Sequence, residues 1–173
     1  MVLLEKHISE IDMSAIALPD DKLEECKYFF GLLSREKNRD KFRWLLSAFL
    51  GACYSYLEIR AKSLYNAFND PETGEPFEDE ESLSILRKYV RTFQNKNNTS
   101  YVKTSGLHVV TKVLYKIRKE NTHNYSLSIM KNGESLPEDF CIGYLQSEDI
   151  PALQFCREVL ELFNKIEEEL SEA

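Results

Sequence analysis

The longest periodic run in this chain extends from Lys41 to Phe68. Its apolar residues recur every three to four positions, as on one face of an α-helix; they are Phe42, Leu46, Phe49, Cys53, Tyr56 and Leu57. At a rise of about 1.5 Å per residue, this helix would be roughly 40 Å long. A helix of that length needs neighbours to cover its apolar face, so the run predicts the central helix of a bundle.

Four shorter segments also carry helical periodicity, and polar or proline-containing stretches separate them. We expect these helices from about Asp21 to Leu33, Glu80 to Gln94, Ser105 to Asn121 and Ile150 to Leu170. The chain of 173 residues has only 6 Gly and 5 Pro, which disfavours a turn-rich sandwich or barrel. The predicted fold class is therefore an all-α, up-and-down helical bundle of about five helices.

Side chains that can cap a helix stand at the start of three of these segments. An aspartate or hydroxyl side chain at this position accepts a hydrogen bond from a backbone N–H that the first turn leaves unpaired. The predicted capping residues are Asp20 or Asp21, Thr104 or Ser105, and Asp149, with Pro151 in the first turn of the last helix.

The stretch between the last two helices has a different pattern. The letters YSLSIM alternate, KNGE is typical of a turn, and FCIGYL could pair back. Residues 125–145 are therefore predicted to form a short β-hairpin or a loop insertion. Residues 1–18 form an amino-terminal segment of ambiguous pattern. No linker or internal repeat divides the chain, which predicts a single helical domain over residues 1–173.

Composition limits the classes of protein and of site. No stretch has the roughly 18 apolar residues that cross a bilayer, and the amino end does not resemble a signal peptide, so we expect a cytoplasmic protein without a membrane partner. The four cysteines lie far apart without a C-x-x-C pair, which favours buried free thiols over zinc or disulfides. No Walker-A loop, G-x-G-x-x-G or H-E-x-x-H motif occurs, so no cofactor and no metal site is expected.

Charge is distributed unevenly along the chain. The formal net charge is −7, yet between Ser82 and Asn132 ten basic residues accompany a single acid, Glu120. That segment therefore carries +9, and the remainder of the chain carries −16. A local site for a polyanion on an acidic protein would produce this asymmetry, and so would two solvated helix faces rich in lysine.

The helix that ends near residue 121 brings an arginine round to its apolar side. With Leu107 at zero and about 100° per residue, Arg118 falls at about 20° and Asn121 at about 320°, within or beside the apolar stripe. A guanidinium there must be paired, contact an anion or reach a wet crevice, because unpaired burial is very costly. A regular helix would place His123 at about 160°. Arg118 and His123 can therefore act together only if the helix ends or distorts after about Glu120, or if a second subunit completes the site.

A purely structural interpretation of these residues is also open. Arg118 near a helix C-terminus interacts favourably with the helix dipole, and its long stem can pass core residues to reach solvent. His123 can cap the carbonyl groups that a helix end leaves free. On the long helix, Glu58 and Arg60 are more often inter-helix pairs than catalytic groups, and a tyrosine such as Tyr54 is more often part of a core than a stacking platform.

Two stretches are informative in combination. They are KYFFGLLSREKNRDKFRWLLSAFLGACYSYLEI and RKENTH, the latter running from Arg118 to His123. The first resembles the paired opening helices of the HEPN-like superfamily (higher eukaryotes and prokaryotes nucleotide-binding domain). The second resembles that superfamily's arginine–x4-6–histidine motif, which usually stands near the end of a late helix, before a final one. The resemblance covers the chain from about Leu23 to Leu170.

This resemblance implies an all-α bundle that commonly dimerises. Many members are metal-independent ribonucleases in toxin–antitoxin, phage-defence or RNA-processing settings, and Arg118 and His123 would be the catalytic pair. Histidine can exchange a proton near neutral pH, and the planar fork of arginine suits the charge that grows on a phosphate during attack by the RNA 2′-hydroxyl. The implied partners are a second copy of the chain, RNA or a nucleotide, and an antitoxin-like protein.

Other side chains would bind substrate in such a site. Asn121 could orient the substrate or the histidine, and Lys112, Lys116 and Lys119 would hold neighbouring phosphates. Members often carry asparagine, aspartate or histidine directly after the motif arginine, whereas this chain has Lys119. That difference and the acidic total favour an alternative, a non-catalytic HEPN-like module that binds nucleotide, RNA or a protein.

Overall fold

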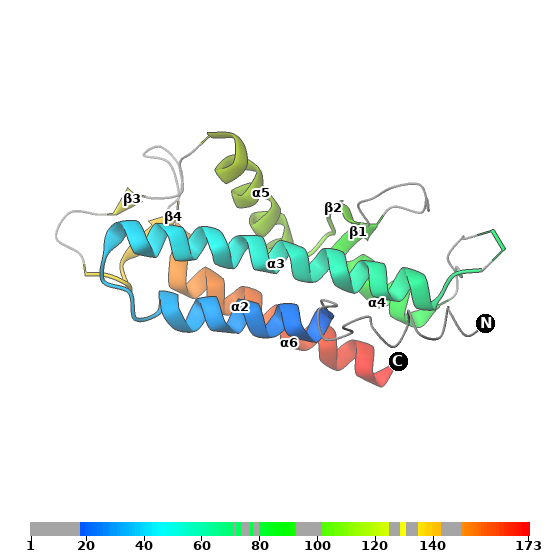
Figure 1. Cartoon of the computed structure of the whole chain (residues 1–173). Helices are drawn as coiled ribbons and strands as arrows, with labels where there is room; N and C mark the ends of the chain where they lie inside the picture. Colours follow the sequence, from blue (N-terminus) through cyan, green and yellow to red (C-terminus); the bar gives the residue numbers. More distant parts are fainter. Residues whose placement is uncertain are drawn as a thin grey trace, which may run out of the picture.

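The computed structural model describes residues 18–70, 72–73, 77, 80–92, 102–124, 129–130, 135–142 and 150–173, with the backbone alone for residues 92, 120–124 and 129–130. These residues confirm the predicted all-α bundle with a short hairpin. Five helices dominate them, namely α2 (Pro19–Leu33), α3 (Arg39–Ala67), α4 (Glu81–Tyr89), α5 (Val109–Asn124) and α6 (Ala152–Glu172) (Figure 1). Within this part of the chain, no helix is both long and apolar enough to span a bilayer.

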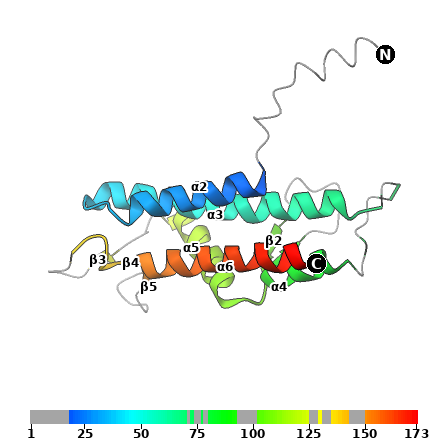
Figure 2. The ribbon, with the colours of Figure 1, turned by 90° about the horizontal axis from the view of Figure 1, so that it is seen from below.

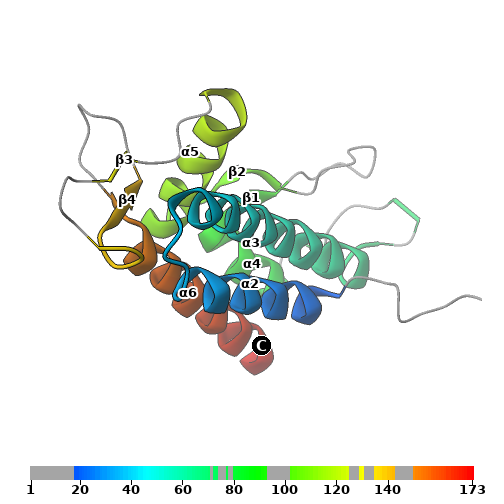
Figure 3. The ribbon, with the colours of Figure 1, turned by 60° about the vertical axis from the view of Figure 1, so that its left-hand side comes forward.

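The bundle has two layers. The helices α2 and α3 run in opposite directions side by side, and α6 lies beneath this pair with α4 beside it (Figure 2). The helix α5 contacts α3 and α6, and it lies on the side of α3 away from α2 (Figure 3). The long periodic run is thus the central helix that the sequence predicts, since α3 contacts α2, α4 and α5.

Two small antiparallel sheets join the helices. The strand β1 (Val90–Thr92) pairs with β2 (Val102–Ser105), and the second sheet has the order β3 (Ile129–Met130), β4 (Phe140–Ile142), β5 (Ile150–Pro151). The pairing of Ile129 with Cys141 confirms the predicted hairpin between the last two helices. The hairpin of β1 and β2 was not predicted, and the helix expected from Glu80 to Gln94 is wrong beyond Tyr89. Pairing of Val90 with Ser105 replaces helical hydrogen bonds there.

Apolar side chains from all three long helices form one core. Tyr56 of α3 lies 4.3 Å from Phe163 of α6, measured between ring centroids. Phe42 of α3 lies 4.3 Å from Phe140, which attaches the sheet of β4 to the bundle. All four rings are buried. Deep burial of large rings on each element explains why the bundle is held by packing rather than by helix propensity alone.

Three cysteines meet in this core. Cys26, Cys53 and Cys156 come from α2, α3 and α6, and none of them is exposed. Cys141 of β4 is also buried, and all four are free thiols, as the sequence predicts. Burial raises the pKa of the Cys53 and Cys156 thiols, and the Cys26 thiol adds to the rise at Cys53. The neutral thiol is therefore the stable form of these side chains.

The predicted helix caps at Asp20 or Asp21 and at Thr104 or Ser105 are wrong. The helix α2 already begins at Pro19, so both aspartates lie in its first turn. Their negative charges interact favourably with the positive end of the helix dipole, but neither side chain occupies the capping position. Thr104 and Ser105 belong to β2 because strand pairing extends to Ser105.

At α6, Pro151 is the residue before the helix rather than part of its first turn, and Asp149 lies outside the described residues. The cap that the sequence analysis missed is Asn38, whose Oδ1 accepts from the N–H groups of Asp40 and Lys41 at 3.1 Å each. These two hydrogen bonds fix the start of the central helix.

An ion-pair cluster links three helices near one end of the bundle. Arg60 of α3 pairs with Glu167 of α6 through two nitrogens and lies 3.2 Å from Asp20 of α2. The buried Tyr56 hydroxyl donates to the same Glu167 carboxylate. Arg60 is therefore an inter-helix pair, as the structural interpretation of the sequence favours.

Candidate functional site

The helix α5 starts later than expected, and this changes which residues form its apolar stripe. The helical spacing of Leu107, Val110, Leu114 and Ile117 predicts that all four are buried, but Leu107 lies before the helix and is 73% exposed, so this prediction is wrong for Leu107. Leu114 and Ile117 are buried as expected, and Val110 is half-buried. The reason lies at Gly106, whose N–H donates to the Tyr89 carbonyl at 2.7 Å and holds the chain against the end of α4 before it turns outward.

A groove rich in cations lies between α3, β2 and α5. In Figure 3, α5 and β2 lie on the side of α3 away from α2. We call it the basic groove. Its volume is about 690 Å³, and its lining residues are Tyr54, Lys103, Thr104, Ser105, Lys112, Tyr115, Lys116, Arg118 and Lys119. Five of these nine side chains are cationic and none is a carboxylate. The four lysines are exposed, so their charges face solvent and any ligand that enters.

Arg118 rests on an aromatic ring at the floor of the basic groove. Its guanidinium carbon lies 3.2 Å from the centroid of the Tyr54 ring. Such a contact between a guanidinium and a π face is attractive, more so where water is partly excluded. The half-buried Arg118 therefore reaches the apolar side of α5 because Tyr54 of α3 offers it a flat electron-rich surface there.

The Tyr54 ring is itself held in place by Glu58, one helical turn further along α3. The Tyr54 hydroxyl donates to Glu58 Oε1 at 2.6 Å. The other oxygen, Oε2, accepts from the backbone N–H of Val102 at 3.1 Å. Because Val102 begins β2, one carboxylate connects two walls of the basic groove. Glu58 is thus an inter-element partner rather than an isolated acid.

The two tyrosines of the groove remain neutral phenols. Burial and the hydrogen bond to Glu58 raise the pKa of Tyr54, and the nearby Arg118 opposes that rise. Burial also raises the pKa of Tyr115, with further contributions from Tyr54 and Glu58. The Tyr54 and Tyr115 rings lie 5.4 Å apart. The positive charge of the groove is therefore not offset by phenolate.

The structure brings together four of the six predicted site residues. Arg118, Lys112, Lys116 and Lys119 line the same groove, while Asn121 and His123 continue α5 with side chains outside the described part of the chain. Sequence reasoning missed Tyr54, Lys103, Thr104, Ser105 and Tyr115. Lys103 could have been found from its place in the basic segment, but the approach of Tyr54 to α5 depends on tertiary packing.

The backbone of α5 decides between two sequence-based alternatives for the arginine–histidine pair. The helix continues through His123 to Asn124, so the alternative in which it ends after about Glu120 is wrong. Five helical residues turn the side-chain direction by about 500°, which leaves His123 about 140° from Arg118 around the helix axis. Completion of the site by a second subunit stays a prediction, as does a purely structural role for Arg118 and His123.

No protein-family model, curated protein or solved structure matches this chain. The HEPN-like resemblance therefore stays a prediction, and the geometry of the basic groove carries the functional argument. Among the described residues, no three His, Cys, Asp or Glu side chains gather as metal ligands would.

Proposed function

We propose that this chain is a cytoplasmic HEPN-like protein that binds RNA through the basic groove. The observation that carries the proposal is that five of the nine residues lining one groove are cationic, with Glu58 as a carboxylate behind its tyrosines, in a protein whose net charge is −7. Self-repulsion among clustered cations disfavours such an arrangement unless a polyanion neutralises it. A phosphate backbone is such a polyanion, because lysine and arginine neutralise its phosphates and release the condensed counterions.

The spacing of the groove cations suits consecutive phosphates. Lys112, Lys116 and Lys119 follow one another at i, i+4 and i+7, so they lie along one face of α5. Lys103 on β2 lines the same groove. Flexible lysines act as point charges for phosphates, whereas the planar fork of Arg118 can bind two phosphate oxygens at once. Arg118 would therefore fix the register of a strand that the lysines attract.

Affinity and its salt dependence test the binding function. The probe is a 12-nucleotide single-stranded RNA with a fluorescent label, measured by anisotropy between 50 and 200 mM salt. Contact with about five phosphates predicts a slope of log K against log salt of about −3.5. The double variant Lys112→Ala, Lys116→Ala should reduce that slope by about 1.4. The matched control is Lys62→Ala, an exposed lysine of α3 outside the groove. Equal slopes in both variants would refute a role for the groove.

A second candidate function is metal-independent RNA cleavage. Its support is the position of Arg118 in the basic groove, with His123 following on the same helix. His123 would take the proton from the 2′-hydroxyl while that oxygen bonds to phosphorus and the bond to the 5′-oxygen breaks. The products are a 2′,3′-cyclic phosphate and a 5′-hydroxyl, whose oxygen takes its proton from water. Because regular helical geometry separates these two positions by about 140° around the axis of α5, we propose a homodimer in which His123 comes from the second copy. An antitoxin-like protein is a further partner in this proposal.

Mixed dimers separate this mechanism from binding alone. Purified protein should cut single-stranded RNA in EDTA, and Arg118→Ala or His123→Ala should abolish cutting. If the pair forms between subunits, mixing the two inactive variants should restore activity, because each mixed dimer contains one intact pair. Cutting that survives both substitutions would exclude the proposed site. Binding without any cutting would leave the non-catalytic RNA-binding module.

A further inference from the structure

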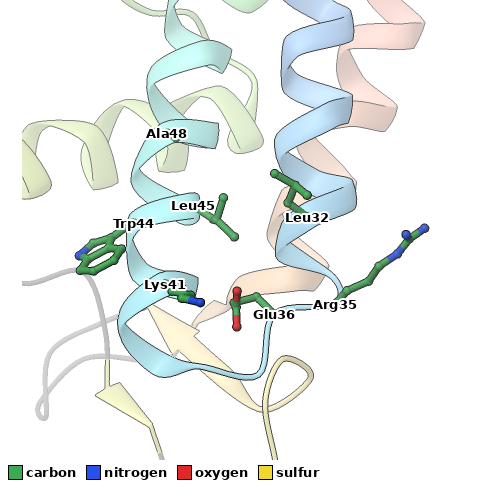
Figure 4. A pocket seen from close by; sticks show the side chains of 7 residues that line it. All are labelled: Leu32, Arg35, Glu36, Lys41, Trp44, Leu45 and Ala48. Atoms are coloured by element: carbon green, nitrogen blue, oxygen red, sulfur yellow. The ribbon is translucent and has the colours of Figure 1, made fainter.

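A second groove lies on the opposite side of α3 from α5, between the end of α2 and the start of α3. Its apolar walls are Leu32, Trp44, Leu45 and Ala48 (Figure 4). Glu36 and Lys41 lie between the two helices near the connector, whereas the side chain of Arg35 extends away from α3 (Figure 4). We call it the apolar groove; its volume is about 660 Å³. It shares no lining residue with the basic groove, so whatever occupies it is distinct from the proposed RNA.

The walls of the apolar groove expose side chains that a bundle normally buries. Trp44, the only tryptophan of the chain, is 66% exposed, and Leu32 is 39% exposed. A single exposed apolar residue is ordinary, but several that adjoin in one concavity mark an interaction site. Tryptophan is also among the residues that contribute most to binding energy at protein interfaces.

The shape of the apolar groove fits another helix. Two helices packed side by side leave a straight furrow that accepts a ridge of side chains from a third. On α3, the lining residues Trp44 and Ala48 are followed by Gly51 at i, i+4 and i+7, on the helix face that points away from the buried stripe. Gly51 is exposed, and a Cβ atom added there would meet nothing within 4 Å. The small residues at 48 and 51 would let a backbone approach closely.

The charges around the apolar groove indicate which charge the flanking side chains of that helix should carry. Between residues 35 and 43 there are five basic and two acidic residues. Asp40 lies 3.6 Å from Arg43, whereas Glu36 accepts from the backbone N–H of Asn38 at 2.7 Å and keeps its charge, so the segment has a net charge of +3. The remaining cations, Arg35, Lys37, Arg39 and Lys41, are exposed. A partner with acidic flanks would complement them.

We propose that the apolar groove binds an acidic amphipathic helix of another protein. The ridge of that helix carries apolar residues at i, i+4 and i+7, which lie against Trp44, Leu32 and Ala48. Its flanking carboxylates face the cations of the connector. The helix α6 of a second copy does not meet this description, because its apolar side, including Phe163 and Ile166, is already buried in the core. A membrane surface would suit a protruding apolar patch better than a furrow between two helices.

A displayed library of 16-residue helices tests the proposal. Three anchor positions at i, i+4 and i+7 are Leu, Ile, Met or Phe, and the flanks vary among Glu, Lys and Ser. Selection on the whole protein should enrich acidic flanks, and the selected peptide should shift Trp44 emission to shorter wavelength. The variant Trp44→Ala, Leu32→Ser should lose at least tenfold in affinity, while its circular dichroism stays unchanged because both side chains are exposed. Lys62→Ala, outside the groove, should bind normally.

Four outcomes would overturn the proposal. Enrichment of neutral or basic flanks, or no enrichment above the double variant, would exclude an acidic helix. Trp44 emission that changes on dilution would show that a second copy covers the groove. A change on removal of residues 1–17 would show that the chain covers it itself. A blue shift with vesicles of anionic lipid but not with peptides would assign the groove to a membrane surface.

Discussion

Substitution of Tyr54 should reveal how strongly the basic groove depends on its aromatic floor. The Tyr54→Leu variant removes the ring beneath the Arg118 guanidinium and the hydroxyl that donates to Glu58. A cation–π contact contributes about 0.5–1 kcal/mol at an exposed site and about 2 when desolvated, so these half-buried side chains should lose about 1 kcal/mol. The hydrogen bond to a charged carboxylate should contribute another ~1.5 kcal/mol. Tyr54→Leu should therefore destabilise the fold by about 2.5 kcal/mol, and the matched Tyr54→Phe by about 1.5.

Urea unfolding and a double-mutant cycle measure the two parts separately. The cycle combines Tyr54→Leu with Arg118→Met, and its coupling energy isolates the contact between ring and guanidinium. We expect a coupling of about 1 kcal/mol for Tyr54→Leu and close to zero for Tyr54→Phe, which keeps the ring. RNA affinity should fall about fivefold for Tyr54→Leu at every salt concentration, because the number of cations is unchanged.

The reasoning about the groove floor is refuted if the coupling energy of Tyr54→Leu with Arg118→Met lies below ~0.3 kcal/mol, which is within the error of additivity. It is also refuted if Tyr54→Phe weakens RNA binding as much as Tyr54→Leu. In that case the hydroxyl and Glu58, rather than the ring, would determine the position of Arg118.

Three further predictions concern the frame that supports the grooves. Glu167→Ala leaves Arg60 without its bidentate partner and should lower stability by about 3 kcal/mol, measured as a fall of about 6–12 °C in Tm. Gly106→Ala places a Cβ 2.5 Å from the Tyr89 carbonyl carbon, so urea unfolding should show a loss of about 1–3 kcal/mol. The hydrogen bond from the Tyr89 hydroxyl and the nearby Lys88 lower the pKa of Glu169. The ionised carboxylate therefore stabilises the fold at a pH above the ordinary pKa of glutamate. This stabilisation is lost as the pH falls through the lowered pKa. Glu169→Gln should therefore reduce the urea midpoint at pH 7, and the difference from the unmodified protein should shrink as the pH is lowered below the ordinary pKa of glutamate.

Periodicity predicts the helices well where packing follows it. The run from Lys41 to Phe68 becomes α3 almost unchanged, because a long stripe buried against several neighbours leaves little choice of conformation. The expected helix from Glu80 to Gln94 fails beyond Tyr89, where valine and threonine pair with a strand more than ten residues later. Such pairing is a non-local contact that local spacing does not encode.

In the candidate site, too, the sequence predicts the contacts that depend on local helical spacing but not those that depend on tertiary packing. Lys112, Lys116 and Lys119 share a face because helical spacing alone places them there, and the sequence predicts this. The unusual position of Arg118 is also visible in the sequence, since its angle falls beside the apolar stripe. Its partner Tyr54 is not, because 64 residues separate the two and only the packing of α5 on α3 joins them.

The buried cysteines can report how the protein unfolds, because each thiol becomes reactive only when its surroundings open. Alkylating reagents react with thiolate, so Cys26, Cys53 and Cys156 should be labelled only when the helices separate. Cys141 lies in the small sheet of β4 and should be labelled earlier, if that sheet detaches while the helices stay packed. Mass spectrometry of the modified thiols over time would thus distinguish local detachment of the β4 sheet from unfolding of the whole helical bundle, without adding a probe to the chain.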